Sequence, residues 1–288
     1  MVLVASSAGG VVAAVVLAAA VAHAGWNLMA KVLDDQVVAF WLINLAAAVC
    51  GVVLLAFAGL PARAAWPYLG VSVALHLGYN TTLLNSYRFG DLGQVYPLSR
   101  GIAPLGVTAL AAAFAGEELS GAQLLGVAVI AGGVGSIVWL GGARAPGRDR
   151  RAVVLAVCTG VLIAGYSASD GLGVRHSADP FGYAGLLFAV ESTAMVVGLA
   201  TWRCRLVPGR PSSRWGLGLA AGVLSVATYS AVLWAQTRLA LGVVSALRET
   251  SVVVAALFGT LVLHERSGRR RLLAAAVVCA GVAVLVVS

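Results

Sequence analysis

Charged residues are scarce in this chain of 288 residues. Asp, Glu, Lys and Arg together make up 10% of it and the mean hydropathy is +0.95, whereas a soluble domain carries roughly 25% charged residues. The composition therefore excludes a soluble globular domain and indicates a chain that lies in lipid. The apolar runs are continuous and lack the alternation of apolar and polar residues, over about ten residues, that a membrane β-barrel needs. An all-α membrane protein is the class that remains.

Motifs for bound cofactors are lacking as well. The four cysteines, Cys50, Cys158, Cys204 and Cys279, show no paired spacing of the kind that holds a metal, so we predict neither a metal nor a cofactor. No G-x-x-x-x-G-K-[ST] loop occurs, and no soluble segment is long enough to hold one. The chain therefore has no site for ATP, and if it moves molecules across the membrane, the energy must come from a gradient. The net charge of +8 is interpreted as a record of topology, with no nucleic-acid partner expected.

What the chain does have is long apolar segments. A spanning helix needs about 20 mostly apolar residues, and Pro, Gly and Arg punctuate the joints between such segments. The pattern predicts ten transmembrane helices, at residues 11–31, 37–58, 66–87, 92–115, 121–141, 152–174, 181–202, 214–237, 241–263 and 270–287.

The sequence repeats itself after about 150 residues. Between the two copies the clearest matches are Gly93 with Gly242, Leu98 with Leu247 and Gly133 with Gly281. We predict two five-helix repeats, residues 1–143 and 152–288, joined by a linker at 144–151. Because five is an odd number, the second repeat is inverted in the membrane relative to the first. Inverted repeats place a binding site between the two halves, near the middle of the bilayer.

Positive residues are distributed unevenly between the two sides. The even-numbered connections between predicted helices carry only Arg63, Arg175 and Arg238. The odd-numbered connections and their flanks, which lie on the opposite side of the membrane, carry Lys31, Arg88, Arg144, Arg148, Arg150, Arg151, Arg203, Arg205, Arg210, Arg214, Arg266, Arg269, Arg270 and Arg271. The positive-inside rule places the odd connections in the cytoplasm. Both termini are therefore predicted to face outward from the cell membrane.

Three segments make the chain similar to a known family. They are "HAGWNLMAK" in the first helix, "AGYSASDG" at the matching place in the sixth, and "SALRETSVVVAALFGTLVLHER" followed by "LLAAAVVCAGVAVL". On these the chain resembles the EamA-like, ten-helix members of the drug/metabolite transporter superfamily. The resemblance implies two inverted repeats, a central cavity with the fifth and tenth helices at the periphery, and transport, often export, of small metabolites, amino acids or drugs. Members usually keep both termini in the cytoplasm, and the arginine distribution here predicts the reverse.

Four charged residues fall inside the predicted helices: Arg100, Glu191, Arg248 and Glu249. A charge at a helix centre costs about 2.5–3.5 kcal/mol on insertion scales, so it needs a partner, water or a function. Arg100 or Arg248 could bind a substrate carboxylate or phosphate, because a guanidinium offers a planar fork of donors and stays charged. Glu249 or Glu191 could instead carry a coupling proton.

Further candidates line the same predicted helices at spacings of three or four residues, which share one helical face. His23 could relay protons, and aromatic rings could pack against an apolar or cationic substrate. The full set of candidate substrate-binding residues is Arg100, Arg248, Glu249, Glu191, His23, Trp26, Asn27, Tyr79, Tyr96, Tyr166, Asp170 and Trp234.

Structural roles compete with these. Arg248 and Glu249 could simply pair with Glu191 or Arg100 to hold helices together, and His23 could be a packing residue. Small residues in the fifth and tenth helices allow close helix approach, either within the chain or across a homodimer.

Three functions remain open on the sequence. The first is a secondary active transporter that works by alternating access, an exporter driven by a proton or substrate gradient. The second is an intramembrane enzyme that uses His23, His76, Asp170 and Glu191 on a lipid-linked substrate, although no H-E-x-x-H or G-x-S-x-G motif occurs and the duplication is left unexplained. The third is a passive channel, for which no repeated filter sequence is present. We therefore predict a transporter and not an enzyme.

Overall fold

The computed structural model of the chain describes residues 7–33, 35–89, 92–140, 150–202, 214–254 and 268–288. Nearly all of these residues are helical, since backbone groups in hydrocarbon must be hydrogen-bonded within their own segment. The elements are α1 (Ser7–Lys31), α2 (Gln36–Ala58), the short 3₁₀ helix η1 (Arg63–Ala65), α3 (Trp66–Phe89), α4 (Leu92–Ala115), α5 (Gly121–Leu140), α6 (Arg150–Arg175), α7 (Pro180–Trp202), α8 (Trp215–Gln236), α9 (Leu241–Arg248) and α11 (Gly268–Val287). The predicted all-α membrane fold with ten spanning segments is confirmed.

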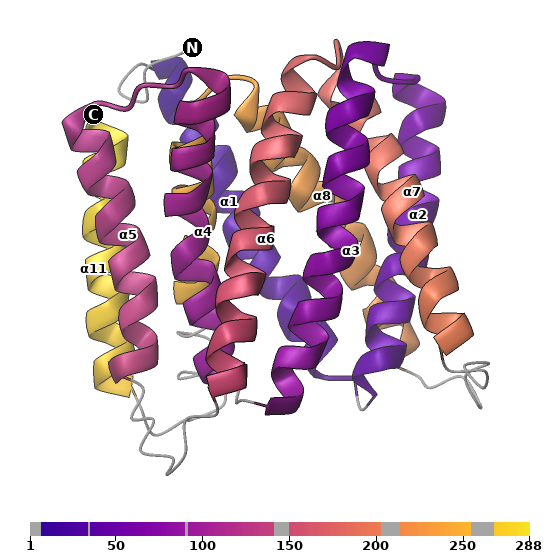
Figure 1. Cartoon of the computed structure of the whole chain (residues 1–288), viewed down its shortest axis with the longest axis horizontal. Helices are drawn as coiled ribbons and strands as arrows, with labels where there is room; N and C mark the ends of the chain where they lie inside the picture. Colours follow the sequence, from indigo (N-terminus) through magenta and orange to yellow (C-terminus); the bar gives the residue numbers. More distant parts are fainter. Residues whose placement is uncertain (1–6, 34, 90–91, 141–149, 203–213, 255–267) are drawn as a thin grey trace.

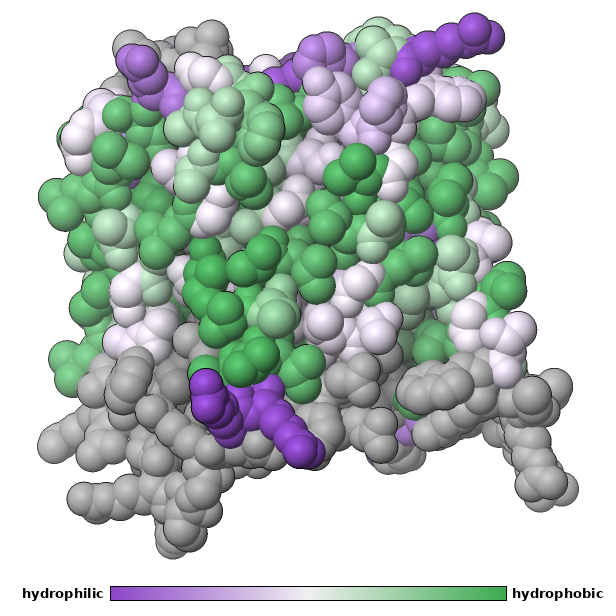
Figure 2. Space-filling view, in the orientation of Figure 1, coloured by the Kyte–Doolittle hydropathy of each residue, from purple (hydrophilic) through white to green (hydrophobic). Residues whose placement is uncertain are grey.

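The long helices run side by side through the molecule, with both termini at one end (Figure 1). Five of them, α1, α2, α6, α7 and α8, are long and apolar enough to cross a membrane by length and composition alone. Figure 2 shows apolar side chains over the middle of one face and hydrophilic ones at its two ends. This is the surface that a bilayer requires of a multi-pass protein.

Short polar signals begin several helices. Asp35 caps α2, because its carboxylate accepts hydrogen bonds from the backbone N–H groups of Val37 and Val38. Before α5, Ser120 and Gln123 exchange side-chain and backbone hydrogen bonds of 3.1 and 3.2 Å in a capping box. These residues fix where the spans start, which explains why most helix limits agree with the sequence prediction within a few residues.

Helix packing follows the inverted repeat. α1 packs against α8 and α3 packs against α6, while α2 packs against α7, α4 against α9, and α5 against α11. Under the repeat, α1 is equivalent to α6, α2 to α7, α3 to α8, α4 to α9 and α5 to α11. The α1–α8 contact is therefore equivalent to the α3–α6 contact, and each of the other three contacts is equivalent to itself. A two-fold relation between inverted halves requires this pattern.

Glycines at the contact of α5 with α11 show the same symmetry at the level of residues. A Cβ on Gly133 would meet a Val278 methyl at 2.8 Å, and one on Gly281 would meet Ile130 at 2.7 Å. Gly281 follows Gly133 by 148 residues and Val278 follows Ile130 by the same number, so the two contacts are equivalents. Glycine is needed at both positions because any larger side chain would hold the helices apart.

These two helices lie at one edge of the molecule, as the resemblance implied (Figure 1). Their small residues are used for packing within the chain, while Leu125 and Leu273 point outward with 58% and 62% of their surface exposed. A homodimer through this edge stays a prediction. The predicted linker at 144–151 lies almost wholly outside the described residues, and α6 already begins at Arg150, so the division into repeats at these residues also stays a prediction.

Candidate functional site

The ninth spanning segment is interrupted at its most polar point. We predict one helix over 241–263, yet α9 ends at Arg248 and helical structure resumes at residues 250–254; residues 255–263 lie outside the described ranges. At Glu249 the backbone N–H is shared between the carbonyls of Ser245 and Ala246, and the Glu249 carbonyl accepts from Val252 three residues on. This is the spacing of a 3₁₀ turn. A local 3₁₀ turn therefore presents the Glu249 side chain inside the molecule.

Glu249 is fully buried and forms an ion pair with Arg100. Arg100 Nη1 lies 3.2 Å from Glu249 Oε1, and Arg100 is itself only 4% exposed. Arg100 belongs to α4, in the first half of the chain, whereas Glu249 follows α9 in the second half. The ion pair thus joins the two repeats where α4 packs against α9.

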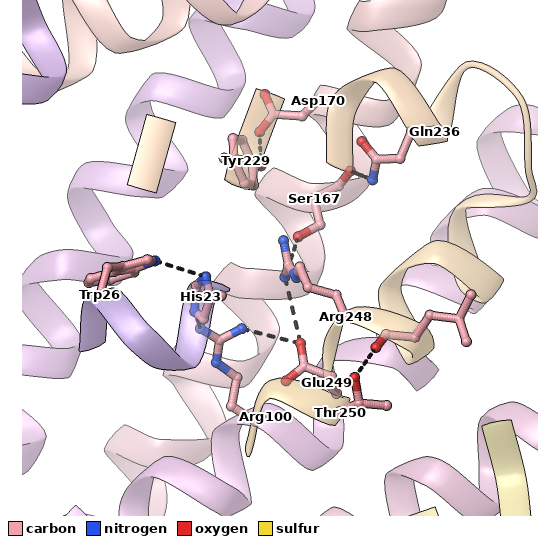
Figure 3. Close-up of polar contacts among 11 residues, drawn as sticks. His23, Trp26, Arg100, Ser167, Asp170, Tyr229, Gln236, Arg248, Glu249 and Thr250 are labelled. Carbon is pink, nitrogen blue, oxygen red and sulfur yellow. Dashed lines mark hydrogen bonds and ion pairs between the residues drawn. The ribbon is translucent and has the colours of Figure 1, made fainter. Parts of the chain in front are cut away.

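Arg248 adds a second guanidinium to this carboxylate. Its Nη2 lies 3.7 Å from Glu249 Oε1 and donates to the Ser167 hydroxyl at 3.3 Å. Figure 3 shows Arg248 between Ser167 and Glu249, with Tyr229 and Asp170 beyond Ser167. The guanidinium carbon is 6.0 Å from the centre of the Tyr229 ring, within reach of a cation–π interaction.

His23 of α1 lies on the other side of Arg100. Its Nε2 is 3.2 Å from Arg100 Nη2, and its Nδ1 accepts a 3.2 Å hydrogen bond from the Trp26 indole N–H. Asn27 donates instead to the backbone carbonyl of His23 at 2.8 Å. Both imidazole nitrogens therefore face groups that can only donate, although a neutral imidazole offers one acceptor nitrogen. The donors around His23 outnumber its acceptor capacity.

We call Arg100, Glu249, Arg248 and His23 the arginine cluster. Two guanidinium groups face one carboxylate oxygen, so the cluster has a surplus of positive charge. Within the described residues, Glu249 Oε2 and Arg248 Nε are buried without a hydrogen-bond partner. Burying charged groups without full compensation is costly. The arrangement is suited to receive an anionic group such as a carboxylate or phosphate.

A second group of polar residues lies on α6, α7 and α8. Asp170 is fully buried and accepts from the hydroxyls of Tyr183, at 3.0 Å, and of Tyr229, on its two different oxygens. Each carboxylate oxygen thus has a phenol donor. Tyr229 also lies near Arg248, which connects this group to the arginine cluster.

Aromatic rings continue from there toward α3. The His76 ring stacks on Tyr166 with centroids 3.8 Å apart, and Tyr79 meets Tyr166 edge to face at 5.5 Å. Glu191, in α7, accepts a 3.2 Å hydrogen bond from the Asn80 amide of α3. Of the structural alternative predicted for the arginines, the Glu249–Arg100 pair is present, whereas Arg248 contacts Glu249 and Ser167 and forms no ion pair with Glu191 among the described residues.

Another ion pair, between a buried carboxylate and a partly exposed arginine, lies at the end of the molecule that carries the termini. Glu117, in the α4–α5 turn, pairs with Arg175 at the end of α6 at 2.6 Å and accepts from the Leu241 backbone N–H at 2.8 Å. Arg175 also donates to the carbonyls of Gln236 and Leu239, at 2.8 and 3.0 Å. We call this set the terminal-side latch. It ties a turn of the first repeat to the α8–α9 connection of the second.

The remaining predicted site residues fall elsewhere. Trp234 lies near the end of α8 with the Arg238 guanidinium 4.1 Å above its ring, and no described contact joins it to the arginine cluster. The side chain of Tyr96 lies outside the described residues. Sequence reasoning missed Ser167, Gln236 and Tyr229 as members of the polar network. Tyr229 and Gln236 lie seven residues apart on one face of α8, a spacing that the polar-stripe criterion could have found.

Comparisons with known proteins agree with this fold. The model of the EamA-like transporter family matches residues 150–287. One solved structure, described only as a protein crystal structure, has a TM-score of 0.76 and 17% sequence identity over 95% of this chain and 97% of its own. No curated protein matches the chain. The predicted resemblance to the drug/metabolite transporter superfamily is thereby confirmed over the second half of the chain, where the matched family is described as a family of transporters.

Proposed function

We propose that this chain, a membrane transporter of the drug/metabolite type whose residues 150–287 belong to the EamA-like family, is a secondary active transporter for a small molecule bearing an anionic group. The observation that carries the proposal is the arginine cluster. It holds two buried guanidinium groups against one shared carboxylate oxygen, at a contact between the two repeats. A metabolite, amino acid or drug-like molecule with a carboxylate or phosphate supplies an acceptor for Arg248 Nε, which is buried without a hydrogen-bond partner among the described residues.

Glu249 has a defined part in this proposal. Its carboxylate compensates part of the charge of Arg100 and Arg248 while no substrate is bound, because leaving both guanidinium groups without a carboxylate in a membrane interior would be very costly. An incoming substrate anion competes with Glu249 for the same donors. Binding thereby loosens a contact that joins α4 to the end of α9, which is the coupling between occupancy and conformation that alternating access requires.

The proposed direction is export, as the family resemblance implies, and the proposed orientation has the termini outside and the arginine-rich connections in the cytoplasm. Arg150 and Arg151 begin α6 at the end opposite the termini, in agreement with this orientation. Energy comes from a proton gradient or from exchange with a second substrate.

Counterflow in proteoliposomes tests the function. The wild-type protein is compared with Arg248→Ala and Glu249→Gln across radiolabelled amino acids, organic anions and cationic drugs. We expect saturable exchange of an anion-bearing class and a loss of at least tenfold in both variants. Glu118→Gln is the matched control, since Glu118 is exposed and its neutralisation should leave exchange unchanged. Exchange of cationic drugs alone, or equal exchange in all variants, would contradict the assignment.

A further inference from the structure

Glu191 lies at the centre of a spanning helix and outside the arginine cluster. It is eleven residues from either end of α7 (Pro180–Trp202), which is about 16 Å along the axis in each direction. Only 7% of its surface is exposed. It is therefore a carboxyl group in the middle of the molecule, far from water at both ends.

The three carboxyl groups buried among the spanning helices differ in their partners. Glu249 contacts two guanidinium groups, and Asp170 accepts from two phenol hydroxyls. Glu191 accepts from the Asn80 amide and the Ser192 hydroxyl, both neutral, and no ion pair involves it in the part of the chain that the structure describes.

The elements packed against α7 supply little positive charge. α3 presents Asn80, which donates to Glu191, and His76, while α6 presents the carboxylate of Asp170. On the α2 side, Gly51 packs directly on the backbone of Ala189 and has no side chain to offer.

On the α8 side of α7, Tyr229 meets Phe188 at a distance of 6.0 Å between ring centres. His76, stacked on Tyr166, is the one titratable base among these neighbours.

We propose that Glu191 is the proton-binding site of the transporter, separate from the arginine cluster that binds the substrate. An ionised carboxylate without a cationic partner is expensive to bury, so Glu191 holds a proton in the closed arrangement seen here. When the halves open to water, the carboxylic acid releases that proton to solvent on one side. The resulting carboxylate takes a proton from solvent on the other side before it is buried again. This inference rests on the proposed transport function.

Glu249 and Glu191 are therefore expected to have different roles. Glu249 stays charged because two arginines hold it, and it responds to substrate. Glu191 changes its charge because no guanidinium group contacts it among the described residues, and it responds to protons. Replacing Glu191 with Gln mimics the protonated form and keeps an oxygen that accepts from Asn80, so the substitution leaves the helix packing intact.

Proteoliposome assays separate the two roles. With equal pH on both sides, Glu191→Gln should retain counterflow of the exchanged class within about twofold, because that reaction needs no net proton movement. Under an imposed pH gradient the same variant should lose accumulation of substrate, and the pH change reported by trapped pyranine, by tenfold or more. Glu249→Gln should lose both, and Glu118→Gln, at an exposed position outside both sites, should retain both. Gradient-driven accumulation that persists in Glu191→Gln would overturn the proposal.

Infrared spectroscopy of the full-length protein in lipid gives a readout that needs no substrate. We expect a band from a protonated carboxyl group that titrates with pH, is present in the wild type and in Glu249→Gln, and is absent in Glu191→Gln. A band unchanged in Glu191→Gln would overturn the assignment even if no probe in the panel were exchanged. If the band is lost as expected while the wild type exchanges nothing, the proton site stands and the proposed function fails for the probes used.

Discussion

Arg100 and Glu249 occupy equivalent positions in the two repeats and form an ion pair with each other at 3.2 Å. They are 149 residues apart, as are the matched residues Gly93 and Gly242. Two equivalent residues can touch only close to the two-fold axis that relates the halves. Identical repeats would place like charges there, so divergence of the two copies has produced an attraction at the point where symmetry alone would give repulsion.

Exchanging these two residues tests that relationship. Arg100→Gln or Glu249→Gln alone should lower the stability of the detergent-solubilised protein by about 3–5 kcal/mol, because each leaves a buried charge with less compensation. The double exchange, Arg100→Glu with Glu249→Arg, should recover much of that loss, since the positions are equivalent. Thermal unfolding followed by intrinsic fluorescence measures the effect. A double variant no more stable than the single ones would show that the surroundings of the two positions differ too much for the symmetry to matter.

Weakening the terminal-side latch should open that end of the molecule. Glu117→Gln removes the ion pair with Arg175 while keeping an oxygen for the Leu241 N–H. In a background without the native cysteines, a cysteine placed at the buried Ser245 should then react at least threefold faster with a membrane-impermeant thiol reagent added on the side of the termini. Glu118→Gln, at the exposed neighbour, should leave the rate unchanged. Equal rates in both variants would mean that the latch does not limit access.

Close packing of α5 on α11 should make Gly281 intolerant of a side chain. A Cβ at this position would lie 2.7 Å from Ile130 and 3.0 Å from the backbone of Gly126, so Gly281→Ala should destabilise the protein by about 1–3 kcal/mol, as overpacking typically does. Gly132→Ala is the matched control in α5, because nothing lies within 4 Å of its Cβ position. Thermal unfolding compares the two variants, and similar midpoints would contradict the close contact.

The orientation of the chain can be measured directly. We expect a cysteine at residue 178, between α6 and α7, to be labelled from outside intact cells, and one at residue 146, in the arginine-rich connection, to be labelled only after permeabilisation. The measurement is modification by an impermeant maleimide in a cysteine-free background. The reverse pattern would place both termini in the cytoplasm and would contradict the proposed orientation.

Sequence alone determined the class and most of the architecture of this protein. Low charge and long apolar segments leave helices as the structure that satisfies the backbone in lipid, and capping residues such as Asp35 and Ser120 place the helix starts. The internal repeat predicted the inverted halves, and the offset of 149 residues between Gly93 and Gly242 is also the offset between Arg100 and Glu249. These features are local or periodic, so they can be found without knowing which helices touch.

Only the tertiary structure decided how the buried charges are partnered. Glu191 and Glu249 look alike in sequence, since each is a carboxylate within an apolar span, yet one contacts two arginines and the other an amide and a hydroxyl. The 3₁₀ turn at Glu249 and the position of Trp234 beside Arg238 likewise depend on neighbours distant in the chain or on local backbone geometry that apolar periodicity does not encode. In a membrane interior the cost of a charge depends on its partners, and those partners are brought together only when the two repeats pack.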